Sequence, residues 1–415
     1  MLEINADRLI RTLSELAQIG ATAEGGVTRF ALTDADWRAR EWLLGQAGRY
    51  GFHGRTDAAG NLFVFDPEHA NDKTPILVGS HLDTVLNGGR YDGALGVLSA
   101  LECLIRLKEA AACLKHPVEL VVWTEEEGSR FKGGLVGSRA FIGELPLSEL
   151  DEADEEGVSL REALEQRGLD VAEIPRLKRE PGDIRAYLEL HIEQGGVLDT
   201  AGEQIGIPTG IVGIRRYDLS LLGQANHAGT TPMQLRRDAL VGAAEMVQSV
   251  ERLTRESGFT QAVATVGKLT VSPGGVNIVP GRVDFSLEIR DLEAGVMDRL
   301  AELILPALEA IAQRRGLDLH WERTADVKPA PLDETLRQVI GEIAGALGYS
   351  FREMPSGAGH DAQHLARICP TGMIFVPSVG GISHAPAELT RDADCIRGAT
   401  LLLNTLKALA EEPTE

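Results

Sequence analysis

The sequence predicts an α/β protein in which a mixed sheet carries helices on both faces and is interrupted by a smaller, two-layer α+β domain with a ferredoxin-like arrangement. In the first half of the chain, short apolar runs of strand length alternate with helical patterns. From about residue 212 the pattern changes to longer alternating strands and two long helices. The 415 residues are enough for two domains with separate cores.

The larger domain is expected to comprise residues 1–211 and 327–415, with Pro329 and Pro331 marking the linker back to it. Its predicted helices cover 6–19, 34–50 and 93–108, and its predicted strands cover 61–65, 75–79, 118–124 and 186–193. Residues 144–185 are acidic and weakly patterned, and we expect them to form a solvated surface helix and loops.

The smaller domain is expected to comprise residues 212–326. Its predicted strands cover 216–222, 262–271, 282–291 and 317–323, and its predicted helices cover 239–254 and 292–315. Two strand–helix–strand units of this kind would place two helices against one compact sheet.

The charge balance excludes some classes of partner. Lys and Arg number 41 against 62 Asp and Glu, so the formal net charge is −21, which argues against nucleic acid and anionic membranes as partners. An anionic substrate is still compatible with this charge, because a local pair of arginines can override the average field. The chain lacks a long apolar run, a signal-peptide pattern at its start and a C-x-x-C pair, so we expect a cytoplasmic protein.

Histidines and carboxylates stand where predicted strands end. In GSHLDTVLNGGRYDG, His81 and Asp83 alternate at the end of an apolar strand, and a loop brings Asp92 back nearby. Histidine with carboxylate is a usual set of zinc ligands, and Asp83 could orient His81.

Three further fragments share this placement. The acids of TEEEG follow the strand 118–124, His191 lies in ELHIEQG, and His384 lies in the Gly-rich GGISHAPAE. A lone histidine is more often structural, and three adjacent acids more often form a solvated turn. Four such fragments at strand-to-loop junctions of one α/β sheet, where sites form, predict a metal site.

These motifs carry a family resemblance. The order H-x-D, D-G, E-E-G, H-I-E-Q-G and S-H-x-P-A-E resembles the amidase/hydantoinase/carbamoylase branch of the di-zinc aminoacylase and carboxypeptidase superfamily, from Gly25 to Glu388. HIEQG and NHAGTTPM together are specific to this branch, whose members include N-carbamoyl-L-amino acid hydrolases, β-ureidopropionases and allantoate amidohydrolases. The resemblance therefore implies a hydrolase of C–N bonds other than peptide bonds.

The resemblance also implies the roles of the site residues. Asp92 would bridge two divalent ions; His81 and His191 would bind one of them, and Glu127 and His384 the other. Glu126 would be the general base and Glu125 a bystander. Zn²⁺ or Mn²⁺ is expected, and Co²⁺ and Ni²⁺ also suit a mixed N/O site.

By the same resemblance, Arg290 would grip the substrate carboxylate as a fork. Asn277, Gln194 and His227 would hydrogen-bond the substrate, and Gly359 in SGAGHDA would offer backbone groups. The branch dimerises through the smaller domain, and a histidine matching His227 completes the partner subunit's site, so we expect a homodimer. The alternative for Arg290 is a surface ion pair with no role in substrate binding.

Two classes of substrate stay open, allantoate and simple N-carbamoyl amino acids. Arg216 in IVGIRRYDL, together with SGAGHDAQ and NHAGTTPM, favours allantoate, because an additional donor could read its second ureido group. The alternative is an N-carbamoyl-L-amino acid or N-carbamoyl-β-alanine. A dipeptidase or aminoacylase is disfavoured, since other branches carry an acid where His191 stands. An inactive ligand-binding homologue is disfavoured because Glu126 and all the expected ligands are present.

Overall fold

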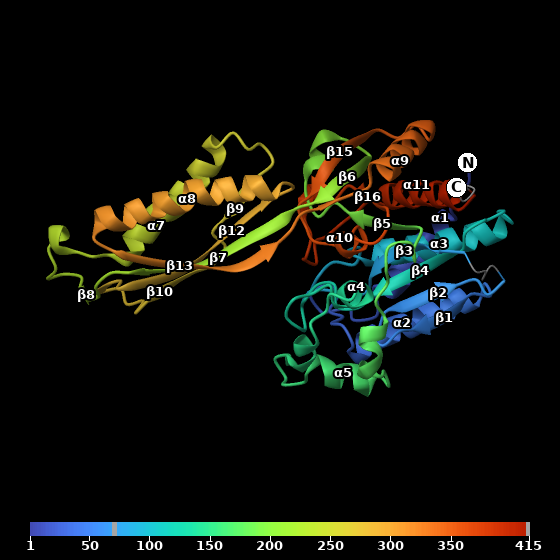
Figure 1. Cartoon of the computed structure of the whole chain (residues 1–415), viewed down its shortest axis with the longest axis horizontal. Coiled ribbons are helices and arrows are strands. Elements are labelled where there is room, and N and C mark those ends of the chain that lie inside the picture. The colour runs from blue at the N-terminus through green and yellow to red at the C-terminus, as the bar shows by residue number, and fades with distance from the viewer. Residues whose placement is uncertain (69–72, 412–415) are drawn as a thin grey trace. The chain divides into compact units, whose positions relative to one another are not determined.

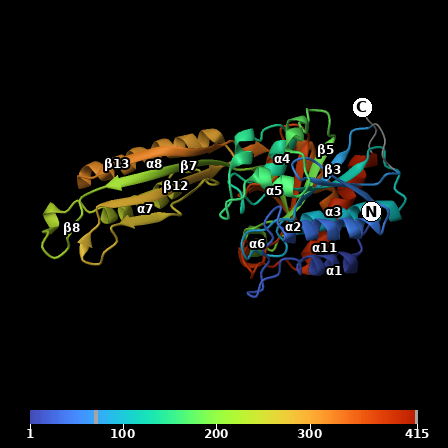
Figure 2. The ribbon, with the colours of Figure 1, turned by 90° about the horizontal axis from the view of Figure 1, so that it is seen from below.

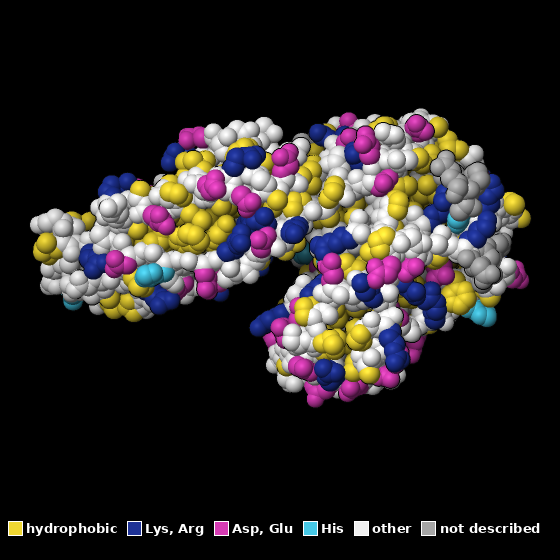
Figure 3. Space-filling view, in the orientation of Figure 1, with side chains coloured by type: hydrophobic (Ala, Val, Ile, Leu, Met, Phe, Trp, Pro, Cys, Tyr) yellow, Lys and Arg dark blue, Asp and Glu magenta, His cyan; other side chains and the backbone are white. Residues whose placement is uncertain are grey.

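The computed structural model describes residues 1–68 and 73–411, so the last four residues of the expected larger domain lie outside the described part. The chain divides into two compact units, Met1–Thr209 with Pro331–Glu415, and Gly210–Ala330. Within the described residues, no helix is long and apolar enough to cross a membrane. On the face shown in Figure 3, acidic and basic side chains are interspersed.

The first unit is built on a mixed sheet, as the sequence predicts. In the described part of the chain nine strands form it, in the order β1-β2-β4-β3-β5-β16-β6-β14, with β15 also paired to β6. Strands β3, β4, β5 and β16 run parallel to their neighbours in this set, whereas β1 and β2 are antiparallel. The strands are β1 (His53–Thr56), β2 (Leu62–Phe65), β3 (Ile76–His81), β4 (Val118–Trp123), β5 (Ala186–Ile192), β6 (Ile205–Ile211), β14 (Ala330–Pro331), β15 (Phe351–Ser356) and β16 (Thr371–Val376).

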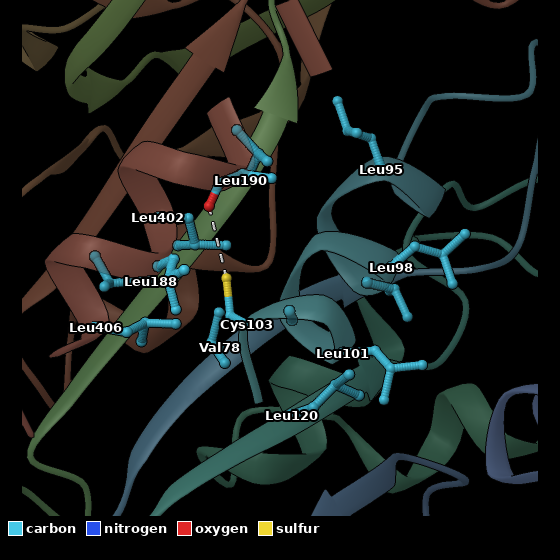
Figure 4. Close-up of a cluster of buried hydrophobic side chains, with 14 of the residues drawn as sticks. Val78, Leu95, Leu98, Leu101, Cys103, Leu120, Leu188, Leu190, Leu402 and Leu406 are labelled. Atoms are coloured by element: carbon cyan, nitrogen blue, oxygen red, sulfur yellow. Dashed lines mark hydrogen bonds between the residues drawn. The ribbon is translucent and has the colours of Figure 1, made fainter. Parts of the chain in front are cut away.

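Helices cover both faces of this sheet (Figures 1 and 2). One face packs against α3 (Ala94–Glu109), α9 (Glu334–Ala346) and α11 (Asp392–Glu411), and the other against α4 (Val136–Phe141) and α10 (Ala362–Leu365). Helix α1 (Ala6–Leu16) packs on α3 and α11. Leucines of α3 and α11 meet the inward side chains of β3, β4 and β5 in one buried cluster (Figure 4). Because β3 and β5 are buried throughout, the polar residues at their carboxyl ends are held on a rigid base.

Helix boundaries follow capping residues. The side chain of Asn5 accepts from the backbone of Arg8 at the start of α1, and Thr33 does the same for α2 (Asp34–Gly48). Helix α3 begins directly after Gly93, whose φ of 63° is left-handed. The loop that contains Asp92 therefore passes straight into a largely buried helix.

One expectation for this unit was wrong in part. Residues 144–185 do not form only solvated helix and loops, because several of them belong to a small hydrophobic core that they share with residues 31–32, 59 and 131–140. Helix α5 (Leu160–Gln166) starts with a capping box from Ser159 and Glu162 and buries Leu160 and Leu164. The sparse apolar residues were easy to overlook among the acids; those buried with them are Leu145, Leu150, Val171 and Ile174.

The second unit is a two-layer α+β structure. Its antiparallel sheet has the order β10-β12-β7-β13, with β9 also paired to β12, and α7 (Ala239–Glu256) and α8 (Ala294–Arg315) share a core with its inward side chains. The strands are β7 (Gly213–Leu222), β9 (Val263–Thr265), β10 (Leu269–Ser272), β12 (Arg282–Asp291) and β13 (Asp318–Val327). Two short strands, β8 (Asn226–His227) and β11 (Ile278–Val279), form a separate pair.

The single strand expected over 262–271 is two strands. Thr265 pairs with Glu288, but Leu269 pairs with Phe285, so this side of the ladder carries one more residue than β12 does. The extra residue forces a bulge around Gly267, which apolar alternation does not reveal.

Candidate metal centre

Three parallel strands and one loop bring the predicted site residues together. Strand β3 ends at His81, β5 contains His191, and the acids of TEEEG follow β4. The loop between β16 and α11 contributes His384. The carboxyl ends of parallel strands meet at one edge of a sheet, so residues far apart in the sequence converge there.

Asp92 lies at the centre of this cluster. Its Oδ1 lies 3.4 Å from Nε2 of His81 and 3.1 Å from Nε2 of His191. Its Oδ2 lies 3.3 Å from Nε2 of His384, which is also 3.3 Å from Oε2 of Glu127. The two carboxylate oxygens of Asp92 thus face two different sets of ligand atoms.

These sets suit divalent cations. His81, Asp92 and His191 have ligand atoms within 4.8 Å of one another, and so do Asp92, Glu127 and His384. Buried Nε2 of His191 and Oε1 of Glu127 have no hydrogen-bond partner within the described chain, so a cation would supply the partner they lack. Imidazole and carboxylate are the ligands that Zn²⁺ and Mn²⁺ accept.

The rings of His81 and His191 are oriented so that Nε2 of each can bind a cation. Nδ1 of His81 lies 3.0 Å from the carbonyl of Asp83, and Nδ1 of His191 lies 2.9 Å from the carbonyl of Ile192. A carbonyl oxygen only accepts, so each Nδ1 carries the proton and each Nε2 is free to bind a cation.

The expected role of the Asp83 side chain needs correction. Its Oδ1 is 3.9 Å from Nδ1 of His81, too far for a hydrogen bond, and the backbone carbonyl of Asp83 orients the ring instead. Oδ2 of Asp83 accepts from the backbone N–H of Glu127 at 3.1 Å. The side chain of Asp83 therefore fixes the acidic turn after β4, and its backbone carbonyl orients the histidine.

The three adjacent glutamates lie in different environments. Oε1 of Glu125 accepts from the backbones of Arg130 and Phe131, which ties this side chain to the loop. Oε2 of Glu126 lies 3.6 Å from Nε2 of His81. Burial, with the nearby carboxylates of Glu127 and Asp361, raises the pKa of Glu126 well above its usual value. Burial, and then Asp92, raises the pKa of Glu127 to about 7.

Unusual backbone supports the centre. Gln194 and His384 have φ of 58° and 55°, rare for residues other than glycine, and such strain concentrates at functional sites. The side-chain amide of Gln194 donates to Oδ2 of Asp92 at 2.8 Å. A Cβ on Gly93 would lie 2.5 Å from the His81 ring, so this position has no room for a side chain.

The sequence did not single out two buried residues of this region. His360 in SGAGHDA lies edge-on to His191, with ring centroids 4.5 Å apart, and forms a further ligand-like group with Glu189 and His191. Glu388 in SHAPAE accepts from the backbone of Asp92. Both belong to quoted motifs, but their burial and long-range contacts carry no local signal. Gly359, which the sequence does single out, directly precedes His360, and a Cβ added to it would lie 3.5 Å from Oε1 of Gln363.

In the second unit, the predicted arginines share one acid. Arg290 donates to Oε1 of Glu288 at 2.8 Å, and Nε of Arg216 donates to Oε2 of the same carboxylate at 2.9 Å. All three side chains project from the sheet face opposite the helices. Arg216 and Arg290 are therefore both engaged in ion pairs with Glu288, and these contacts alone do not separate their roles towards substrate.

His227 and Asn277 lie at the other end of this unit. Nδ1 of the exposed His227 accepts from the backbones of Gly229 and Thr230, at 3.0 and 3.2 Å, so its Nε2 carries the proton. Strands β8 and β11 place Asn277 beside it, and its carbonyl accepts from Ala228.

The length of β12 separates these two groups. Arg290 pairs with Ile214 at one end of β12, and Arg282 pairs with Leu222 at the other. The strand rises ~3.3 Å per residue, so roughly 26 Å of sheet lies between the Arg290 end and the His227 end. One copy of the unit therefore does not bring Arg290 and His227 to the same small molecule.

Comparison with known proteins agrees with the resemblance. The model of peptidase family M20/M25/M40 matches residues 77–408. The chain is 44% identical to an N-carbamoyl-L-amino acid amidohydrolase of Geobacillus stearothermophilus, over 98% of this chain and 99% of that protein. It is 39% identical to the allantoate amidohydrolase of Bacillus subtilis, over 95% of each chain. An amidase of the hydantoinase/carbamoylase family from Burkholderia multivorans superposes with a TM-score of 0.93 at 38% identity, covering 99% of both chains.

Proposed function

The chain belongs to peptidase family M20/M25/M40 and is a hydrolase of C–N bonds, and we propose that it removes the ureido group of a small carboxylate with the help of two divalent ions. The observation that carries this proposal is Asp92, whose two oxygens face two ligand sets. A shared carboxylate of this kind is the arrangement that a two-metal hydrolase needs.

The residues around the centre divide the chemistry among them. Two bound cations would act as Lewis acids and lower the pKa of a water molecule. Glu126 lies outside both ligand sets, with its Oε2 3.6 Å from Nε2 of His81. It accepts the proton of the attacking water and passes it to the leaving nitrogen. Neighbouring cations would lower the raised pKa of Glu126 and keep it able to accept.

Residues of both units supply the contacts to substrate. Arg290 binds the carboxylate as a fork, and Nε2–H of His227 donates to the oxyanion that develops on the ureido carbonyl. Gln194, Asn277 and the backbone at Gly359 complete the polar contacts. Arg290 and His227 of one chain are too far apart to contact the same substrate, because most of β12 lies between them. We therefore assign the His227 of each site to the partner subunit of a homodimer built on the second unit.

The choice of substrate is guided by the relatives, because Arg216 and Arg290 make equivalent ion pairs with Glu288. The 44% identity to an N-carbamoyl-L-amino acid amidohydrolase favours a carbamoyl amino acid. The relationship to allantoate amidohydrolases keeps allantoate as the second candidate, because a carboxylate such as Glu288 can accept from a second ureido group.

Parallel assays test the proposal. The metal-loaded protein should release ammonia from N-carbamoyl-L-methionine, from allantoate, or from both, and the faster reaction identifies the substrate class. Glu126→Gln serves as the control for contaminating activity. No turnover of either compound by protein that holds two metal ions would refute the ureido hydrolase and favour an inactive binding homologue.

A further inference from the structure

Glu388 connects the loop of His384 to the loop of Asp92. The residue is buried, with 4% of its surface exposed. Oε1 accepts from the backbone N–H groups of Tyr91 and Asp92, at 3.0 and 3.1 Å, and Oε2 accepts from the hydroxyl of Ser383 at 2.8 Å. Both oxygens are thus engaged, and Glu388 is in neither of the two ligand sets that share Asp92.

The loop that contains Gly89 and Asp92 lies directly against this carboxylate. A Cβ on Gly89 would lie 2.0 Å from the carboxyl carbon and from Oε1 of Glu388. Gly89 is not one of the glycines with left-handed φ, so space and not backbone conformation requires glycine there. The loop that carries Asp92 therefore rests directly on the Glu388 carboxylate.

Ser383 links the same carboxylate to the side chain of Asp92. Its hydroxyl lies 3.1 Å from Oδ2 of Asp92 as well as 2.8 Å from Oε2 of Glu388. The backbone of Asp92 is thus held by Glu388 and its side chain by Gln194, while the single hydroxyl proton of Ser383 is shared between the two carboxylates. Since Asp92 belongs to both ligand sets, a displacement of this residue would disturb both cation positions together.

We propose that Glu388 is a positioning residue of the metal centre, which fixes the shared carboxylate of Asp92 so that two cations bind as a coupled pair. This inference rests on the proposed two-metal function. A purely structural link would hold the loops together with no special effect on metal binding. Residues behind metal ligands typically change metal affinity ~10–100-fold when they are removed.

The test uses the full-length protein, stripped of metal and titrated with Mn²⁺. Glu388→Ala removes all three acceptor contacts, and it should weaken Mn²⁺ binding ~10–100-fold and abolish the exchange coupling of the Mn²⁺ pair in the electron paramagnetic resonance spectrum. Glu388→Gln keeps the Oε1 acceptor for both backbone N–H groups and should bind a coupled pair as the wild type does.

A second substitution changes the loop that contains Gly89, so that the test does not depend on the folding of Glu388→Ala alone. Gly89→Ala should weaken Mn²⁺ binding in the same direction as Glu388→Ala. Gly345→Ala is the matched control, because nothing lies within 4 Å of a Cβ at that position in α9. Wild-type affinity and coupling in Gly89→Ala and Glu388→Ala would overturn the proposal. Failure of the ureido hydrolase proposal would be recognised separately, by a coupled metal pair in a wild-type protein that hydrolyses neither substrate.

Discussion

The assignment of His227 to the partner subunit predicts complementation between two inactive variants. His227→Ala removes a donor to the developing oxyanion, and loss of one such donor costs ~10²–10³ in kcat. Glu126→Gln inactivates the other half of the site. In a mixed dimer, the subunit that carries the His227→Ala substitution keeps its own Glu126 and receives the partner's His227, so one of the two sites is intact.

The size of the recovery follows from random pairing. After the two variants are mixed in equal amounts and allowed to exchange subunits, half of the dimers are mixed and each has one good site, so the activity should reach about a quarter of the wild-type value. Steady-state ammonia release measures it, with each variant alone as the control. If His227 acted within its own subunit, no mixed dimer would contain an intact site, and a mixture that stays inactive after exchange would refute the reasoning.

The hydrogen bonds of His227 predict which replacement retains function. Because Nδ1 accepts from Gly229 and Thr230, Nε2 is a donor and not a base. Glutamine places an N–H group at a similar distance from the backbone, so His227→Gln should recover part of the kcat that His227→Ala loses, whereas the shorter His227→Asn should not. Equal loss in all three variants would contradict a donor role.

Further predictions concern catalysis, substrate binding and stability. Glu126→Gln should lower kcat ~10²–10⁴-fold with metal content unchanged, as measured by elemental analysis; loss of metal would mean that Glu126 is a ligand. Arg290→Lys and Arg290→Ala should raise KM about tenfold to a hundredfold for both ureido substrates, since a charge-assisted hydrogen bond contributes ~1.5–3 kcal/mol. Arg216→Ala should impair allantoate turnover selectively only if Arg216 reads the second ureido group; equal loss on both substrates would assign it to structure. Burial, with Arg367 and Arg139 nearby, lowers the pKa of His364 from 6.5 to about 3. Below pH 6.5 the unfolded chain therefore binds a proton at His364 that the folded chain does not bind. As the pH drops from 6.5 towards 3, the free energy of unfolding should fall by at most ~1.4 kcal/mol per pH unit. Thermal unfolding of His364→Gln at pH 7 and pH 5 should show a smaller acid-induced loss than the wild type, and identical losses would contradict this.

Sequence patterns predicted the sheet of the first unit because its strands are apolar and end in polar loops. The same rule anticipated that His81, His191 and Asp92 would meet, since the carboxyl ends of β3 and β5 lie side by side. Their assignment to particular metals came from the family resemblance, and it stays a prediction.

Other features depend on contacts that no local pattern encodes. Glu388 reaches Asp92 across 296 residues of sequence, and only the folded chain shows that contact. The backbone carbonyl of Asp83, and not its side chain, orients His81, a distinction that alternation along a strand does not make. The bulge at Gly267 depends on the register of β12 with two strands at once.

The metal content of the active protein tests the two-metal centre most directly. Dialysis against a chelator, elemental analysis and reconstitution with Mn²⁺ or Zn²⁺ should show two divalent ions per chain, no activity without them and restored activity with them. Variants of Asp92 should lose both ions, because this residue is shared by both ligand sets. Full activity in protein shown to be free of metal would contradict the account.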